Sequence, residues 1–295
     1  RQMCIRDRGT DQISYDLINE GVKSIFVKYF PEIKKLEKPD EESPYDEIME
    51  WFVINENEIL NLWNSGKPVL NCWMSSSSPF CAEVLAESGY DAITVDLQHG
   101  LNDYKDALSI FQAIGRYPVV PMVRVPWLDP QIIMKTMDAG AMGVICPMIN
   151  NPKQAEEFVS YMRYPPLGQR SFGPTRALYS TGDAYWESAN SKILSLAMIE
   201  TKEAFQNINS IVNTKGLSGV YIGPSDLGIG LSDGDLGPGM DRTEVEVIDA
   251  FKEILNEAKK ANILSGIHCA SPEYAAKAVK WGFDLVTVNS DVKLL

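Results

Sequence analysis

The stretch PVLNCWMSSSSPFCAEVLAESGYDAITVDLQHG, residues 68–100, decides the fold. Its two short runs, PVLNCWM and AITVD, are apolar or β-branched and have the length of buried strands. Between them, residues 79–88 have helical spacing, with Ser78 as a start signal and Gly89 as a stop signal. The stretch therefore predicts a strand–helix–strand unit whose strands run parallel through a right-handed crossover.

The same unit recurs along the chain. Strands are expected at 68–74, 92–96, 119–124, 143–147, 194–200, 219–223, 263–268 and 284–288, and helices at 79–88, 103–115, 129–139, 152–162, 202–212, 243–261 and 271–281. Eight strands that alternate with helices are the number that closes a (β/α)8 TIM barrel. A doubly wound open sheet is the alternative, disfavoured because no GxGxxG follows the first strand.

The barrel domain is expected to occupy residues 56–295. Residues 1–55 lack the regular alternation, and we interpret them as an N-terminal appendage of unknown role. The first eight of them, RQMCIRDR, are as readily explained by an artefact as by native structure. Since the chain stops soon after the eighth strand, the eighth helix is expected to be missing, with an apolar groove in its place.

Charge and cysteine content exclude several classes of function. With 27 Lys and Arg against 40 Asp and Glu, the net charge of −13 disfavours a nucleic-acid or anionic-membrane surface. No apolar run reaches the roughly 18 residues of a membrane span, and no signal peptide is recognisable. The five cysteines are scattered singly, without zinc-ligand spacing. We therefore expect a cytoplasmic protein with reduced cysteines.

Polar residues gather at the carboxyl ends of the predicted strands, where the active sites of such barrels lie. Asp96 ends the second strand with His99 just after it, Arg124 ends the third, Glu200 ends the fifth, and Asp226 follows the sixth. Arg124 could instead be the ion-pair partner of Asp96, and the other two carboxylates could cap helices. Two acids after neighbouring strands, without matching bases, favour a hard-cation site.

Four motifs at these strand ends, VDLQHG, VRVPW, AMIET and GVYIGPSDL, with RYPPLGQRSFGPTRA between them, resemble the HpcH/HpaI aldolase/citrate lyase family of class II, metal-dependent pyruvate aldolases. The likeness is greatest to its dihydroxyheptenedioate and 2-dehydro-3-deoxyglucarate aldolase branches. It covers about residues 56–295 and implies a barrel of the phosphoenolpyruvate/pyruvate type. It also implies a lyase that cleaves 4-hydroxy-2-oxo acids to pyruvate and an aldehyde, through a pyruvate enolate stabilised by Mg²⁺, Mn²⁺ or Co²⁺.

The resemblance implies a role for each matching residue. Glu200 and Asp226 match the metal ligands, and Arg124 matches the arginine that faces the bound pyruvate. His99 matches the catalytic histidine, and Asp138 matches its acidic partner. The turn whose backbone amides hold the substrate carboxylate is matched by Gly223, Pro224 and Ser225.

One position departs from the family pattern. Relatives often carry Gln two residues before the metal-binding Glu, but this chain has Met198, which cannot donate a strong hydrogen bond. Two other functions therefore stay open: a CoA-thioester lyase of the citrate-lyase branch, and a barrel that binds 2-oxo acids without catalysis. Schiff-base catalysis by Lys293 is disfavoured because this residue stands beyond the last strand.

Two further features are expected from the same sequence. By resemblance, the chain is expected to form a homo-oligomer, a hexamer. The segment 163–190, which carries Arg170 and Arg176, is expected to be a long connection before the fifth strand. It either packs on the barrel or forms a rim that shapes the aldehyde pocket. The second histidine, His268, also lies at a strand end and carries less weight as a functional residue.

Overall fold

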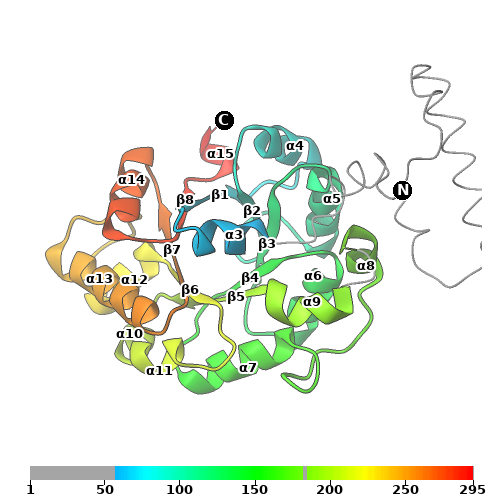
Figure 1. Ribbon diagram of the computed structural model, residues 1–295. Coiled ribbons are helices and arrows are strands. Elements are labelled where there is room, and N and C mark those ends of the chain that lie inside the picture. Colours follow the sequence, from blue (N-terminus) through cyan, green and yellow to red (C-terminus); the bar gives the residue numbers. More distant parts are fainter. Residues whose placement is uncertain (1–56, 182–184, 295) are drawn as a thin grey trace, which may run out of the picture.

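Eight parallel strands close into a barrel in the order of the sequence in the computed structural model, which describes residues 57–181 and 185–294 (Figure 1). The strands are β1 (Val69–Met74), β2 (Ala92–Asp96), β3 (Val120–Arg124), β4 (Gly143–Cys146), β5 (Leu194–Ile199), β6 (Gly219–Ile222), β7 (Leu264–Cys269) and β8 (Leu285–Val288). Strand β1 pairs with both β2 and β8, so the sheet has no edge. The predicted (β/α)8 barrel is confirmed, and the open-sheet alternative is wrong.

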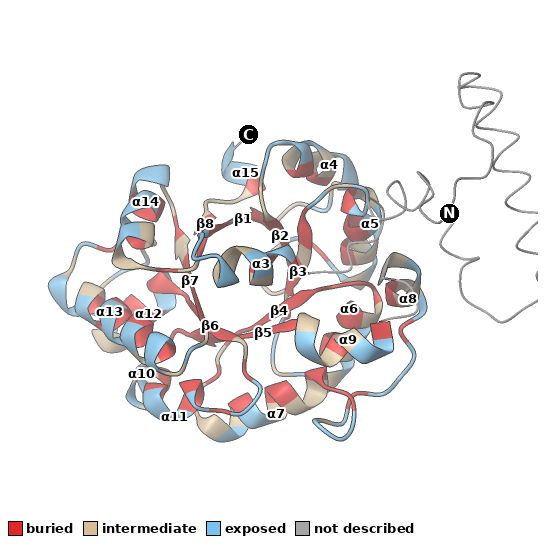
Figure 2. Ribbon diagram, viewed as in Figure 1, coloured by how far each residue is buried: buried red, intermediate tan, exposed pale blue. Residues whose placement is uncertain are grey.

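Helices surround the barrel. They are α3 (Glu58–Asn64), α4 (Pro79–Glu87), α5 (Tyr104–Ile114), α6 (Pro130–Asp138), α7 (Pro152–Met162), α8 (Thr175–Thr181), α9 (Tyr185–Lys192), α10 (Lys202–Gln206), α11 (Ile208–Val212), α12 (Pro224–Leu231), α13 (Val245–Lys260), α14 (Pro272–Trp281) and α15 (Asp291–Leu294). Figure 2 shows that the strands are largely buried, while the helices turn one face inward and the other to solvent. No helix among these residues is long and apolar enough to cross a membrane.

The helix boundaries follow local signals in the sequence. The side chains of Ser78, Asp129, Asn151 and Ser271 each accept a backbone N–H at the start of a helix whose first turn contains proline. Gly282 ends α14 with a φ of 107°, a left-handed conformation that glycine adopts without strain. These short-range rules explain why most of the helices were predictable.

The prediction does not include the helices α3, α12 and α15, and two further segments differ from it. The helix expected at 202–212 is broken at Asn207, where the backbone leaves the helical conformation between α10 and α11. The connection expected at 163–190 contains the helix α8 and most of α9. In both segments, 202–212 and 163–190, the helical spacing of apolar residues is weak, so contacts with the rest of the barrel decide where the helices form.

A buried chain of polar side chains crosses the inside of the barrel. The Thr94 hydroxyl donates to Asn71 Oδ1 (2.9 Å), and Asn71 Nδ2 donates to Thr287 Oγ1 (2.9 Å). The Tyr221 hydroxyl also donates to Thr287 Oγ1 (2.6 Å). Because β1, β2, β6 and β8 supply these groups, this series of hydrogen bonds holds four strands together across the inside of the barrel.

A helix of four residues, α15, follows β8. Its buried Asp291 accepts hydrogen bonds from the Ser75 amide (2.7 Å), the Ser76 amide (3.0 Å) and the Ser76 hydroxyl. These bonds tie the end of β8 to the loop after β1. Within the described residues, this single turn occupies the position of the eighth helix of a (β/α)8 barrel. The appendage expected at 1–55 lies outside the described residues.

Candidate active site

Arg124 and Asp96 form a two-point ion pair at the mouth of the barrel. Arg124 Nε lies 2.8 Å from Asp96 Oδ1, and Nη2 lies 2.6 Å from Oδ2, with side-chain exposures of 12% and 3%. Burial opposes ionisation of Asp96, but the hydrogen bonds and charge of Arg124 outweigh it and lower the pKa of this carboxyl. The ion-pair interpretation of Arg124 is therefore confirmed, and the guanidinium is held in one orientation.

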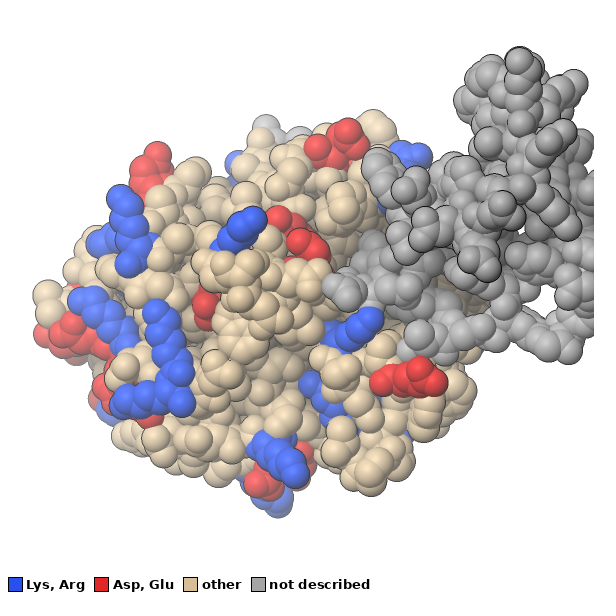
Figure 3. Space-filling view, viewed as in Figure 1, with Lys and Arg blue, Asp and Glu red and all other residues tan. Residues whose placement is uncertain are grey.

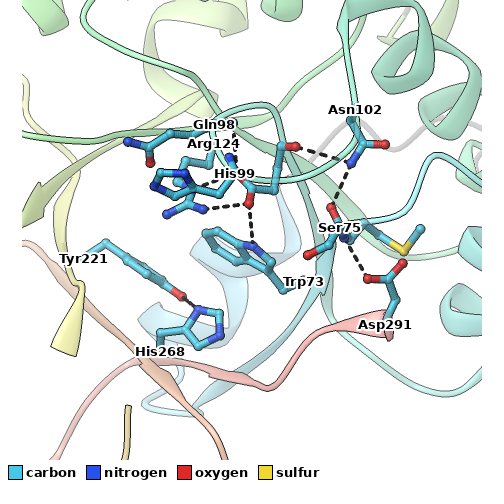
Figure 4. A network of polar contacts seen from close by, with 11 residues as sticks. Trp73, Ser75, Gln98, His99, Asn102, Arg124, Tyr221, His268 and Asp291 are labelled. Carbon is cyan, nitrogen blue, oxygen red and sulfur yellow. Dashed lines mark hydrogen bonds and ion pairs between the residues drawn. The ribbon is translucent and has the colours of Figure 1, made fainter. Parts of the chain in front are cut away.

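An aromatic floor supports this pair (Figure 4). The Arg124 guanidinium lies 4.8 Å from the Trp73 ring centroid, and Trp73 Nε1 donates to Asp96 Oδ2 at 3.3 Å. Trp73 stacks against Tyr221 at 5.8 Å and meets His268 edge-on at 5.0 Å. Because Trp73 contacts both members of the pair, it resists sideways movement of the guanidinium.

The loop after β2 is wrapped onto the same carboxylate. Asp96 Oδ1 accepts hydrogen bonds from the amides of Gln98 (3.0 Å) and His99 (3.3 Å). The side-chain Nδ2 of Asn102 closes the loop by donating to the Asp96 carbonyl at 3.3 Å, and it also donates to the Met74 carbonyl at the end of β1 at 3.1 Å. Figure 4 shows the loop on the side of the network that holds Arg124. His99 is thus exposed at the mouth on a braced loop, where its imidazole is accessible to a substrate.

Glu200 and Asp226 face the opposite side of the mouth, after β5 and β6. Glu200 is 4% exposed, and its Oε1 accepts a hydrogen bond from the Met148 amide at 2.8 Å. Burial raises the pKa of Glu200 to about 7; the Met148 amide opposes this rise and the negative charge of Asp226 adds to it. Asp226 is exposed in the first turn of α12. Ile199 pairs with Ile222, and a Cβ at Gly223 would stand 2.7 Å from Glu200 Oε2, so the turn that leads into Asp226 lies against Glu200.

These two carboxylates fit a divalent cation that takes its other ligands from water and substrate. Among the described residues, no group of three or more His, Cys, Asp or Glu side chains could hold a metal ion. Two carboxylates after neighbouring strands are nonetheless the oxygen donor set that a hard cation prefers. A site of this kind leaves coordination positions for a chelating 2-oxo acid, which a full protein cage would occupy.

Gly223 makes room for the Glu200 carboxylate. A Cβ at residue 223 would stand 2.7 Å from Glu200 Oε2 and 3.1 Å from the Met198 methyl group.

Gly223→Ala is therefore expected to displace Glu200 and to weaken Mn²⁺ binding roughly tenfold or more, because the positions of the ligands in such sites tolerate a displacement of only about 0.5 Å. Calorimetric titration with Mn²⁺ measures this. Gly173→Ala is the control, because a Cβ there meets no atom within 4 Å; equal Mn²⁺ affinity of all three proteins would contradict the expectation.

Asp138 does not join the other site residues within one chain. It ends α6, which runs back from the mouth, and Met142 just beyond it donates to the Pro121 carbonyl near the start of β3 (2.8 Å). Its Oδ1 accepts a hydrogen bond from Arg170 Nη2 at 2.7 Å. Burial raises the pKa of Asp138, although Arg170 opposes this rise. Asp138 therefore lies at the end of the barrel opposite His99.

The described parts of the segment 163–190, residues 163–181 and 185–190, pack at that same end. Arg176 donates to the carbonyls of Ala139 (2.6 Å) and Phe111 (2.8 Å), and Arg170 is buried between Tyr164 and Tyr185. Within a single chain, these contacts support the packing interpretation of the segment and not the rim of an aldehyde pocket.

Three features of the site were missed from the sequence. Trp73 and Tyr221 look like ordinary core residues of strands, and only alternation along each strand could have placed them inside the barrel. Met148 acts through its backbone amide, which no sequence pattern marks. Its φ of 57° is rare for a residue other than glycine, and such strain is typical of functional sites.

His268 is an uncharged histidine below the mouth. Its Nδ1 lies 3.3 Å from the Tyr221 hydroxyl. Burial, followed by the charge of Arg124, lowers the pKa of His268 to about 4; Lys293 adds to this effect, and Asp96 and Asp241 oppose it. The histidine is therefore neutral at pH 7 and is suited to packing and hydrogen bonding.

Acid is expected to destabilise the protein through His268. Below about pH 6.5 the unfolded chain binds a proton that the folded protein does not accept until about pH 4, so stability falls as pH drops through this window. Between pH 7.5 and 5 the loss is about 2 kcal/mol. Urea unfolding of the wild type and His268→Gln at both values measures it. The variant should lose that much less stability, and equal losses would contradict the assignment.

These observations define a class of protein: a (β/α)8-barrel enzyme with an arginine, a histidine and a pair of carboxylates at the carboxyl ends of its strands. Residues 70–295 match the sequence profile of the HpcH/HpaI aldolase/citrate lyase family, and the chain belongs to that family.

Named relatives agree with this assignment. The chain is 38% identical over 239 residues to a hydroxypyruvate/pyruvate aldolase of Rhizorhabdus wittichii, covering 81% of this chain and 94% of the relative. It is 33% identical over 243 residues to a 4-hydroxy-2-oxo-heptane-1,7-dioate aldolase of Shigella sonnei, covering 81% and 91%. A crystal structure of a family member from Burkholderia cenocepacia superposes with a TM-score of 0.75 at 30% identity, covering 81% and 94%. The expectation of an aldolase-type lyase is thereby confirmed.

Proposed function

We propose that the protein cleaves a 4-hydroxy-2-oxo acid to pyruvate and an aldehyde, with a divalent cation at Glu200 and Asp226. One observation carries the proposal: Arg124 ends β3, Glu200 directly follows β5, and Asp226 stands in the first turn of α12 after β6, so all three lie at the carboxyl ends of the parallel strands. A pair of carboxylates opposite a guanidinium suits a substrate that is itself an anion and that gains negative charge during the reaction.

Glu200 and Asp226 would hold the cation, with Mg²⁺, Mn²⁺ and Co²⁺ as the candidates. The cation would supply Lewis-acid stabilisation of the charge that develops on the 2-oxo group. Arg124 adds a fixed positive charge beside the same oxygen, and its contacts with Asp96 and Trp73 keep it from reorienting during the reaction.

The turn after β6 is suited to the substrate carboxylate. Gly223 precedes α12, and Pro224 is its first residue. Of the three predicted turn residues, Pro224 has no N–H to donate and instead fixes the backbone at the start of the helix. Of the predicted residues, Gly223 and Ser225 can donate, and Asp226 adds a third amide; the amides of Ser225 and Asp226 belong to the first helical turn and have no partner within the helix.

His99 is our candidate for the group that removes the proton from the 4-hydroxyl. His99→Ala is expected to lower kcat roughly 10²–10⁴-fold, the range for loss of a general base. Mn²⁺ binding should be unchanged, because His99 contacts neither carboxylate in the structure. Steady-state kinetics and calorimetry measure both quantities, and wild-type turnover by His99→Ala would rule out this base.

The proposed partner of His99, Asp138, implies an assembly of several copies. Since the two residues lie at opposite ends of one barrel, Asp138 must come from a second copy. We therefore propose a homo-oligomer, expected to be a hexamer, built from the barrel at 56–295. Light scattering at assay concentration measures the assembly, and an active monomer would contradict the His99–Asp138 pair.

Cytoplasmic location is also part of the proposal. It is supported by the free thiols of Cys72, Cys81, Cys146 and Cys269.

A substrate screen tests the reaction itself. The enzyme is incubated with pyruvate, Mg²⁺ or Mn²⁺ and a panel of aldehydes, and in the reverse direction with 4-hydroxy-2-oxo acids and malyl-CoA. The proposal predicts carbon–carbon bond formation with at least one aldehyde and pyruvate release from the corresponding acid. Turnover of the CoA thioester alone would favour the citrate-lyase branch. Metal and pyruvate binding without any turnover would favour a non-catalytic barrel.

A further inference from the structure

A loop between α12 and α13 folds back over the turn that carries Asp226. Near its end, Arg242 is only 5% exposed. Its Nε donates to the Pro224 carbonyl at 3.2 Å, and its Nη2 donates to the Ser225 carbonyl at 3.0 Å. Arg242 thus donates hydrogen bonds to the backbone carbonyls of the two residues that directly precede Asp226.

The N-terminal half of α12 leaves space for this guanidinium. A Cβ at Gly228 would stand 2.6 Å from three atoms of the Arg242 guanidinium, so only glycine leaves this space open. The Gly239 amide also donates to the Ser225 hydroxyl at 3.2 Å. The loop and the turn are therefore joined at several points and at close range.

The other side of the loop is fixed to the neighbouring strand unit. Asp241 accepts hydrogen bonds from the Ala270 amide (2.7 Å) and the Ser271 hydroxyl (2.5 Å), just after β7. The Tyr274 hydroxyl donates to the Arg242 carbonyl at 2.8 Å. Arg242 itself also donates to the Gly237 carbonyl (2.7 Å) and to Glu244 Oε1 (3.3 Å). Because the loop is anchored to α14, the guanidinium is a rigid support behind the turn.

We propose that Arg242 is a positioning residue for the metal and substrate site. It holds the first turn of α12 so that Asp226 stays beside Glu200 and the amides of Ser225 and Asp226 stay aligned for the substrate carboxylate. This inference rests on the proposed function of that site. A displacement of 1 Å at such a turn costs on the order of 10² in rate, although Arg242 does not touch the reacting atoms.

The test compares Arg242→Gln with a matched variant, Arg163→Gln. Arg163 is equally buried, at 5%, and donates to the carbonyls of Ile193 (2.9 Å) and Gly216 (3.3 Å), but at the end of the barrel away from the mouth. Mn²⁺ affinity without substrate is measured by calorimetry, together with the unfolding midpoint. Both variants should unfold earlier, but only Arg242→Gln should weaken Mn²⁺ binding, by about tenfold or more.

Two further measurements separate positioning from general stability. Arg242→Lys, which keeps the charge and one donor, should bind Mn²⁺ with intermediate affinity and remains testable if Arg242→Gln does not fold. In Arg242→Ala, added guanidinium at millimolar concentration should restore part of the Mn²⁺ affinity. Wild-type Mn²⁺ affinity in folded Arg242→Gln or Arg242→Lys would overturn the inference, as would an equal loss in Arg163→Gln.

Asp226→Asn separates failure of this inference from failure of the proposed function. Unchanged Mn²⁺ affinity in Asp226→Asn would overturn the metal site and the role of Arg242 together. Weakened binding in Asp226→Asn but not in the Arg242 variants would overturn the positioning role alone and leave the metal site standing.

Discussion

Glu200→Gln is expected to lower kcat/KM for pyruvate release by roughly 10³-fold or more, because one of the two anionic ligands is lost from a site whose chemistry depends on charge stabilisation. Mn²⁺ binding should become undetectable by calorimetry in the same range. The amide occupies nearly the same volume, so the loss cannot be attributed to a cavity.

Stability distinguishes this effect from misfolding. Burial raises the pKa of Glu200 to about 7, so at pH 8 the folded protein holds an ionised carboxylate that the unfolded chain solvates better. The metal-free variant should therefore be at least as stable as the wild type at pH 8. The exposed Glu203→Gln is the control and should retain activity. Substantial turnover by Glu200→Gln would exclude Glu200 as a ligand.

Arg124→Ala is expected to have two separable effects. Loss of the guanidinium should lower kcat roughly 10²–10³-fold, the usual effect of removing one stabilising donor. It also leaves Asp96, whose side chain is 3% exposed, as a buried carboxylate without a cation. Breaking a buried pair in this way typically costs about 3–5 kcal/mol of the free energy of unfolding.

A second substitution separates the two effects. Adding Asp96→Asn to Arg124→Ala should recover most of the stability but none of the rate, because the uncompensated charge is gone while the guanidinium is still absent. Arg116→Ala is the control: its ion pair with Glu83 lies at the surface, at 3.0 Å with 64% of the arginine side chain exposed. That variant should stay close to the wild type. Full activity of Arg124→Ala would contradict the role of Arg124.

The fold was predictable because its signals are local. Apolar runs of strand length, proline in first turns and caps such as Ser78 and Ser271 each act over a few residues. The break at Asn207 and the helix α8 were not predictable. In α8, Arg176 reaches backbone carbonyls of two other helical segments, so distant parts of the chain decide that structure.

Candidate site residues could be predicted from the residues alone where a side chain stands at a strand end or shortly after it, as His99 and Asp226 do. Asp96, Arg124 and Glu200 met that rule, and parallel strands bring their ends together. Asp138 did not, because its position depends on the direction of α6 and its partner in the chain is Arg170. Basic and acidic residues are interspersed on the face in Figure 3, so surface charge adds no further signal there.

The proposed role of Arg242 could not be predicted from the sequence either. In the sequence it is one arginine near the end of a glycine-rich loop, without any motif around it. Its importance follows from the carbonyls of Pro224 and Ser225 that it contacts, and from the absence of a side chain at Gly228. Backbone groups recognised by a distant side chain leave no pattern of residue types.

The most direct test of the account is pyruvate release from a 4-hydroxy-2-oxo acid by enzyme stripped of divalent cations with a chelator and then titrated with Mg²⁺ or Mn²⁺. The account predicts that activity is lost on stripping and restored by either ion in the wild type, but not in Glu200→Gln. Undiminished pyruvate release by the thoroughly stripped enzyme would contradict it.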